Sequence, residues 1–155
     1  MSKRVVAIGV FDGVHRGHQE ILNRAKEIAD GGSVIALTFD PHPATVFAPE
    51  RAPKLLVTLA DRVVLLKIHN ADQVAVIKFD KKFAAMSAED FVDNILIKQL
   101  EATDIVVGEN FTYGHKASVN SRARWQSFAI CSSSGSSPSN LRVSRNRQPN
   151  SIVAP

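Results

Sequence analysis

Short apolar runs rich in β-branched residues alternate along this chain with segments of helical periodicity, and this alternation limits the fold more than any other feature. Strands separated by helices of this length predict βαβ units with right-handed crossovers and a parallel sheet. Two helix starts are marked by Thr58 with Asp61 and by Ser87 with Asp90, pairs at the spacing of a capping interaction. Strands are expected at 5–10, 33–39, 73–79 and 104–108, and helices at 17–29, at 59–69 and after Ser87.

The fold class is therefore α/β, a parallel sheet with flanking helices. Residues 40–57 contain four prolines and no regular period, so we expect a long loop there. The single cysteine, Cys131, excludes an internal disulfide and favours a reducing cytoplasm. Neither a signal-peptide core nor a membrane-spanning stretch stands out, so a cytoplasmic protein without membrane contact is expected.

The composition changes near residue 117. All 15 acidic residues lie before that point, whereas the last 38 residues hold five arginines, 11 serines and no lysine. The net charge of +4 therefore belongs to the end of the chain. We expect one domain over 1–117, with a sheet that is incomplete at its C-terminal end, and a Ser/Arg-rich tail over 118–155 without regular structure.

The segment GVFDGVHRGH joins the first expected strand to the first expected helix. It places His15 and His18 three residues apart, on one face of the first helical turn. A helix start offers free N–H groups and partial positive charge, which suit a phosphate, and Gly13 and Gly17 let the backbone approach it closely. Two imidazoles would then donate hydrogen bonds to phosphate oxygens and stabilise the charge on a leaving pyrophosphate. The alternative is that both histidines only cap the helix and pack.

GVFDGVHRGH resembles the HxGH signature of the Rossmann-like nucleotidylyltransferases. TFDPHP, APKLLVTLADR and GENFTYGHKA follow in that order, and together they are similar to the N-terminal adenylyltransferase module of the bacterial bifunctional riboflavin kinase/FAD synthetases. The resemblance covers residue 5 to about residue 117. It implies a Rossmann-like fold and a cytoplasmic enzyme that converts FMN and ATP into FAD and pyrophosphate with Mg²⁺. Nucleic-acid binding through the arginines of the tail is disfavoured, because the tail lacks interleaved aromatic residues and the rest of the chain is acidic. No nucleic-acid partner and no obligate protein partner are therefore expected.

The resemblance also assigns roles to individual residues. His15 and His18 would be the catalytic pair that holds the ATP phosphates. Asp40, besides its place in the flavin site, would hold Mg²⁺ through water. Asp12 has a structural alternative, a carboxylate that accepts hydrogen bonds from turn N–H groups, and Asp40 has one in an Asx-turn ahead of Pro41. The rest of the ATP site would comprise Gly9, Phe11, Asp12, Gly13 and Gly17, and the flavin site Phe39, Asp40, His42, Asn110 and Phe111.

Residues 118–155 depart from the family pattern. The family continues with a helix, a fifth strand and a Ser/Thr-rich motif that ends in arginine and contacts the triphosphate, followed by a riboflavin kinase domain. Here the segment is instead rich in serine, and arginine is its only charged residue type. Such a composition is typical of a frameshifted reading of a GC-rich gene. A disordered linker is the alternative. The expected function is that of an FMN adenylyltransferase, and the alternative is a truncated, catalytically impaired nucleotide- or flavin-binding fragment.

Overall fold

Five parallel strands form one sheet in the order β3-β2-β1-β4-β5. The computed structural model describes residues 2–108 and 142–146. This order confirms the expected Rossmann-like α/β class, with the first strand of the chain at the centre of the sheet. The strands are β1 (Arg4–Ile8), β2 (Ser33–Asp40), β3 (Gln73–Lys78), β4 (Asp104–Gly108) and β5 (Arg142–Asn146).

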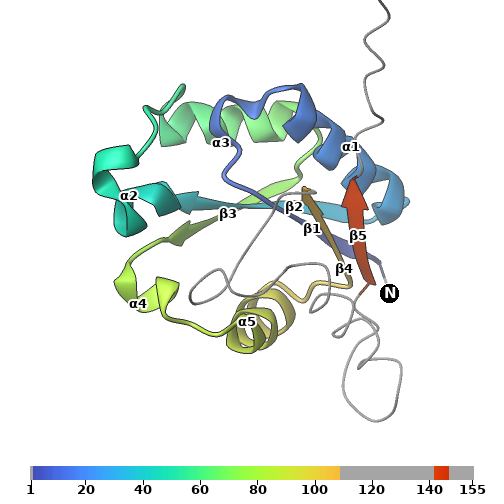
Figure 1. Ribbon diagram of the computed structural model, residues 1–155. Coiled ribbons are helices and arrows are strands. Elements are labelled where there is room, and N and C mark those ends of the chain that lie inside the picture. The colour runs from blue at the N-terminus through green and yellow to red at the C-terminus, as the bar shows by residue number, and fades with distance from the viewer. Residues whose placement is uncertain (1, 109–141, 147–155) are drawn as a thin grey trace, which may run out of the picture.

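Helices cover both faces of the sheet (Figure 1). One face carries α1 (Arg16–Ala29) and α3 (Leu59–Ile68). The other carries α4 (Lys81–Ala84) and α5 (Ala88–Asp90), which continues into η3 (Phe91–Gln99). No helix within the described ranges is long and apolar enough to cross a membrane.

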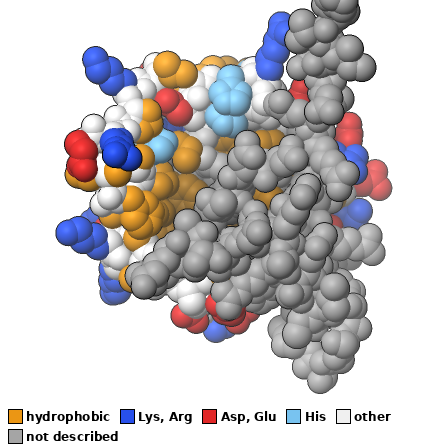
Figure 2. Space-filling model, viewed as in Figure 1, with side chains coloured by type: hydrophobic (Ala, Val, Ile, Leu, Met, Phe, Trp, Pro, Cys, Tyr) orange, Lys and Arg blue, Asp and Glu red, His pale blue; other side chains and the backbone are white. Residues whose placement is uncertain are grey.

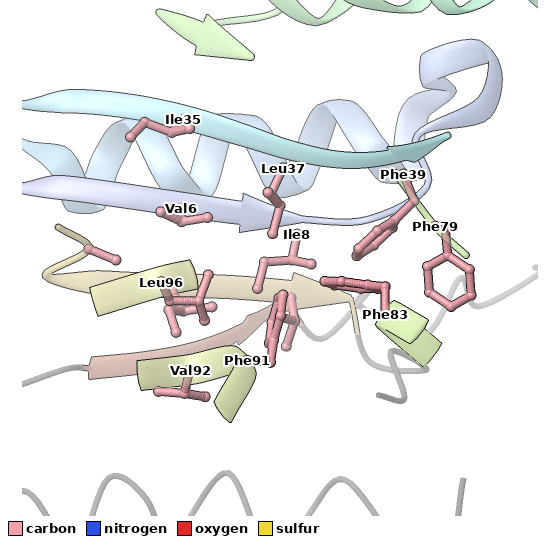
Figure 3. Close-up of a cluster of buried hydrophobic side chains, with 13 residues drawn as sticks. Val6, Ile8, Ile35, Leu37, Phe39, Phe79, Phe83, Phe91, Val92 and Leu96 are labelled. Atoms are coloured by element: carbon pink, nitrogen blue, oxygen red, sulfur yellow. The ribbon is translucent and has the colours of Figure 1, made fainter. Parts of the chain in front are cut away.

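Alternate residues of the central strand feed two separate cores, as the pleat of a strand covered on both faces requires. Val5 and Ala7 pack toward α1 and Leu66 of α3, while Val6 and Ile8 belong to the core formed with α4 and η3. Figure 3 shows the second core, in which aromatic side chains close the end of the sheet where β2 finishes. Its labelled members are Val6, Ile8, Ile35, Leu37, Phe39, Phe79, Phe83, Phe91, Val92 and Leu96.

The helix after Ser87 begins at the expected cap, since the Ser87 hydroxyl accepts a hydrogen bond from the Asp90 N–H at 3.1 Å. From Phe91 onward its hydrogen bonds widen to the i+5 spacing of a π-helix. That spacing brings Phe91 and Leu96, five positions apart and both fully buried, onto the same face. The sequence pattern predicts the start of this helix, but not its wider turn.

The expected long loop over 40–57 is wrong in part, because it contains α2 (Pro43–Phe47) and a 3₁₀ turn, η2 (Pro49–Arg51). The His42 ring supplies the missing start signal: its Nδ1 accepts a hydrogen bond from the Ala44 N–H at 3.0 Å. Pro43 then occupies the first helical position, where its lack of an N–H costs nothing.

Strand β5 lies in the part of the chain for which the sequence predicts no regular structure. It pairs in parallel with β4, in a register that runs from Asp104 opposite Arg142 to Gly108 opposite Asn146. A strand pairs through its backbone N–H and C=O groups, so a segment rich in serine and arginine can still pair with the open edge of β4. The division of the chain near residue 117 stays a prediction, because residues 109–141 lie outside the described part.

Candidate active site

The order of the strands reverses beside β1, since the chain passes to β2 and β3 on one side and returns to β4 on the other. Ligands of open α/β sheets bind at the carboxyl ends of the strands at such a reversal. The turn after β1 and the start of α1 therefore occupy the favoured position. The end of β2, with Asp40 and His42, is next to them in the sheet.

The turn after β1, η1 (Asp12–Val14), is built from residues in the left-handed region of backbone conformation. Phe11, Gly13 and Val14 have φ values of 55°, 74° and 43°. A β-branched residue is rare there, and such positions cluster at functional sites because the surrounding structure must hold them. Here the buried side chains of Phe11 and Val14 anchor the turn in this conformation.

The His15 and His18 rings lie stacked at the start of α1, with their centroids 3.6 Å apart and their planes 22° apart. His18 also meets the edge of the Phe11 ring, at a centroid distance of 5.2 Å. The predicted juxtaposition of the two imidazoles is therefore present, although neither side chain caps the helix. His15 is the exposed member of the pair, and Gly17 lies in the first turn of α1 between them.

Burial, and to a smaller degree the neighbouring His15, lower the pKa of His18 from 6.5 to about 4, while Asp12 opposes the change. His18 is therefore neutral near pH 7. Its Nδ1 atom is buried and has no hydrogen-bond partner among the described residues. A phosphate placed against this pair would favour the protonated ring, because an adjacent anion stabilises the cation.

Asp12 joins the turn to the loop ahead of α3. Its carboxylate accepts hydrogen bonds from the Leu56 N–H, at 2.9 and 3.0 Å to the two oxygens, and from the Val57 N–H at 3.3 Å. A carboxylate that accepts hydrogen bonds from backbone N–H groups is the structural role considered above for Asp12. The donors here belong to a distant loop rather than to the turn itself. Gly13 supports the same junction, since a Cβ atom there would lie 3.0 Å from Leu56 Cδ1.

At the end of β2, a cis peptide bond joins Asp40 to Pro41. The Asp40 backbone carbonyl accepts a hydrogen bond from the Phe79 N–H at 2.9 Å. Its carboxylate makes no hydrogen bond or ion pair with the part of the chain that the structure describes, so the bond of an Asx-turn is not formed there. His42 is half-buried, and burial lowers its pKa; Asp12 acts against this, and Arg62 adds to it.

The structure differs from the expectation that Phe39 presents a flat surface to a flavin. Phe39 is only 2% exposed, and its ring packs against Phe79 and Phe83 at centroid distances of 5.7 and 6.1 Å. The exposed ring of this aromatic group is Phe47, 63% exposed and edge-on to Phe79 at 5.7 Å. Sequence reasoning missed Phe47 because it assigned the whole proline-rich segment to a loop.

The remaining predicted residues are placed as follows. Gly9 lies directly after β1, where its N–H donates to the Leu37 carbonyl at 3.1 Å. Asn110 and Phe111 lie outside the described residues. Within the described residues, no group of three His, Cys, Asp or Glu side chains is arranged to hold a metal ion.

The sheet order and the histidine pair at its reversal define a Rossmann-like α/β domain. Two of the crystal structures that share this fold serve as examples. One, described as the macrolide-efflux protein from Streptococcus pneumoniae, has a TM-score of 0.71 at 23% identity over 96% of this chain and 47% of its own. The other, described as the lipopolysaccharide core biosynthesis protein from Thermoplasma volcanium, has a TM-score of 0.58 at 17% identity over 96% and 98%.

The chain belongs to the FAD synthetase family, whose model matches residues 1–130. It is similar to the bifunctional riboflavin kinase/FMN adenylyltransferase of Bacillus subtilis, with 39% identity over 73% of this chain and 36% of the relative. The protein of the same name from Escherichia coli K12 is 36% identical over 71% of this chain and 36% of the relative. The chain thus matches little more than a third of the length of these relatives.

Proposed function

We propose that this chain is an FMN adenylyltransferase, which transfers AMP from ATP to FMN and yields FAD and pyrophosphate. A phosphate oxygen of FMN attacks the α-phosphorus of ATP, the bond from that phosphorus to the bridging oxygen breaks, and pyrophosphate leaves with the electron pair. The stacked His15–His18 pair at the start of α1 carries the proposal, because it lies at the reversal of the strand order, the position at which open α/β sheets commonly bind ligands. Family membership supports the choice of substrates.

No protein nucleophile is needed for this reaction, so the chain contributes position and charge. The first N–H groups of α1 and the two imidazoles would hold the β- and γ-phosphates, with Gly9, Gly13 and Gly17 leaving room for them. Removing one such preorganised donor typically costs about 10²–10³ in rate. His15 and His18 are therefore the proposed catalytic residues, and Asp12 holds the turn that presents them.

The flavin would lie beside the end of β2. Figure 2 shows hydrophobic side chains gathered in a patch next to exposed histidine, over the region of α2 and α4 in Figure 1. Phe47 offers an exposed ring there for the isoalloxazine system. Asp40 and His42 would face the polar end of the flavin, and Asn110 with Phe111 would complete the site.

Mg²⁺ would enter with ATP. This ion keeps several waters and is usually held by one or two carboxylates together with substrate phosphates. The Asp40 carboxylate, which has no partner among the described residues, fits that need through water. We further propose that the enzyme works in the cytoplasm on these small molecules alone, with no nucleic-acid, membrane or protein partner.

The proposal is tested by FAD formation from FMN, ATP and Mg²⁺, followed chromatographically, together with ATP binding measured by calorimetry. His15→Gln and His18→Gln should each lower the rate about 10²–10³-fold and weaken ATP binding. His69→Gln, at the opposite end of α3 from the Asp12 junction, is the matched control and should change neither. No FAD from the wild-type chain, with ATP binding unchanged in both variants, would overturn the proposal.

A further inference from the structure

Arg62 is fully buried in the middle of α3, at 0% exposure. Its Nη1 donates to the Thr38 hydroxyl at 3.1 Å and to the Phe39 carbonyl at 2.9 Å. Its Nε and Nη2 are buried and have no hydrogen-bond partner among the described residues. No carboxylate within the described ranges forms an ion pair with it.

A buried cation without a counter-ion is unfavourable for folding, and an apolar side chain of similar volume would cost less. The three hydrogen-bond donors left over from Nε and Nη2 add to that cost, because they are removed from water without compensation. Arg62 is therefore hard to explain by stability alone. Its surroundings point to a ligand that carries the missing negative charge.

The guanidinium is bonded to the end of β2, through Thr38 and Phe39. The Thr38 hydroxyl, which accepts this hydrogen bond, donates one of its own to the Val10 carbonyl at 2.7 Å. Arg62, Thr38 and Val10 thus connect α3 with the carboxyl ends of β2 and β1. The turns that follow these strand ends carry Asp40 and His42 on one side and the histidine pair on the other.

His42 follows β2 closely, and the charge of Arg62 acts on its ring. Its Nδ1 is occupied as an acceptor by the Ala44 N–H, so a neutral ring must carry its proton on Nε2. Burial lowers the pKa of His42, Asp12 opposes this, and Arg62 adds a smaller lowering effect. The neutral His42 ring is then an Nε2–H donor beside the end of β2, to which Arg62 is bonded.

We propose that Arg62 is a positioning residue for a phosphate group bound at the carboxyl ends of β1 and β2: its buried charge attracts the phosphate, and its hydrogen bonds to Thr38 and Phe39 fix that charge at the end of β2. The proposal rests on the proposed function for the identity of the ligand, since either FMN or ATP supplies such a phosphate. Asp12 also acts on His42, and its effect on that ring is larger than that of Arg62.

The test compares Arg62→Met, which removes the charge at similar volume, with Arg62→Lys, which keeps it. Thermal unfolding and calorimetric binding of FMN, riboflavin, ATP and inorganic pyrophosphate are measured for both. Arg62→Met should unfold at the same or a higher temperature, and should bind phosphate ligands about tenfold more weakly. Arg62→Lys should retain most of that affinity, and riboflavin binding should not change.

The pattern of losses identifies the source of the phosphate. A loss for FMN but not for riboflavin assigns Arg62 to the flavin phosphate, and a loss for ATP and pyrophosphate assigns it to the triphosphate. Thr38→Val is the matched control, because it removes the hydroxyl contact and leaves the charge; phosphate affinity should be kept. If Arg62→Met does not fold, Arg62→Gln, which keeps donors without the charge, carries the same comparison.

Two outcomes would overturn the proposal. One is a lower unfolding temperature for the uncharged variant with unchanged affinity for every phosphate ligand. The other is FAD formation by the uncharged variant at the wild-type rate and with the wild-type dependence on FMN and ATP concentration, in which case the proposed function stands and the role of Arg62 falls. Weaker pyrophosphate binding in a chain that forms no FAD would instead support the role of Arg62 and overturn the adenylyltransferase.

Discussion

The imidazole rings of His15 and His18 lie face to face, 3.6 Å between centroids, in a turn whose backbone is held in left-handed conformations. Two stacked rings at this distance repel each other when both are cations. His18, whose pKa is lowered by burial and by His15, is thus arranged to take up a proton when an anion compensates for the charge. Its behaviour with pH follows directly.

The free energy of unfolding should decrease as the pH falls from 6.5 toward about 4. Above pH 6.5 His18 is neutral in both the folded and the unfolded chain, so this contribution is fully present. Below that value the unfolded chain takes up a proton, whereas the folded chain resists protonation until about pH 4. Denaturant unfolding at pH 7, 6, 5 and 4 should show a shallower decrease for His18→Gln than for the wild type. Equal slopes would contradict the lowered pKa.

Binding of pyrophosphate should be accompanied by proton uptake between pH 5 and 6.5. The anion stabilises the protonated His18 ring and raises the pKa of His18 toward its ordinary value. Calorimetry in two buffers of different ionisation enthalpy measures the number of protons taken up. His18→Gln should lose most of this uptake, and an unchanged number of protons would place the anion elsewhere.

Gly13→Ala should destabilise the chain more than Gly31→Ala. Both glycines have positive φ, 74° and 87°, so each substitution carries the left-handed penalty of about 1–2 kcal/mol. Only the Cβ at position 13 meets a neighbour, Leu56 Cδ1 at 3.0 Å, whereas nothing lies within 4 Å at position 31. Thermal unfolding measures the difference, and ATP affinity should fall only for Gly13→Ala. Equal losses of stability would mean that the Leu56 contact adjusts freely.

Phe39→Ala and Phe47→Ala should separate stability from flavin binding. Loss of the buried Phe39 ring should cost about 3–5 kcal/mol of stability. Loss of the exposed Phe47 ring should cost little stability and weaken FMN and riboflavin binding alike, since the apolar surface for the ring system is removed. Flavin fluorescence titration and thermal unfolding provide the two measurements. Unchanged flavin affinity in Phe47→Ala would remove the aromatic patch from the site.

The chain should form FAD about 10²–10³-fold more slowly than a version in which residues 118–155 are replaced by the corresponding frame-corrected sequence. The histidine half of the phosphate site is present, whereas the Ser/Thr-to-Arg half expected from the family is missing from the sequence of 118–155. Binding of ATP should suffer less, because the start of α1 remains. Equal rates for the two chains would show that this segment does not matter.

The sequence predicts the elements whose signals are local. Thr58 caps α3 through the Asp61 N–H at 3.1 Å, as the spacing indicates, and the four apolar runs form the four expected strands. It misses α2, whose start depends on the ring of His42 rather than on a Ser, Thr, Asp or Asn side chain. It also misses β5, because pairing with β4 is a long-range property.

Side-chain direction explains where the candidate site differs from what the sequence predicts. The sequence places aromatic residues near the end of β2 but does not show that Phe39 turns inward while Phe47 turns outward. An arginine on an amphipathic helix is typical of a solvated face, so nothing in the pattern of α3 indicates that Arg62 is buried. Both facts depend on how α2 and α3 pack on the sheet.

The central position of β1 has a consequence for synthesis. Arg4 pairs through its N–H with Thr103, 99 positions later in the chain, and β4 completes the second side of β1 only after those residues exist. At roughly 5–20 residues per second, a ribosome needs about 5–20 s to add them. During that interval one edge of the innermost strand is open on the nascent chain, and this edge is where a chaperone or a second nascent chain would first make contact.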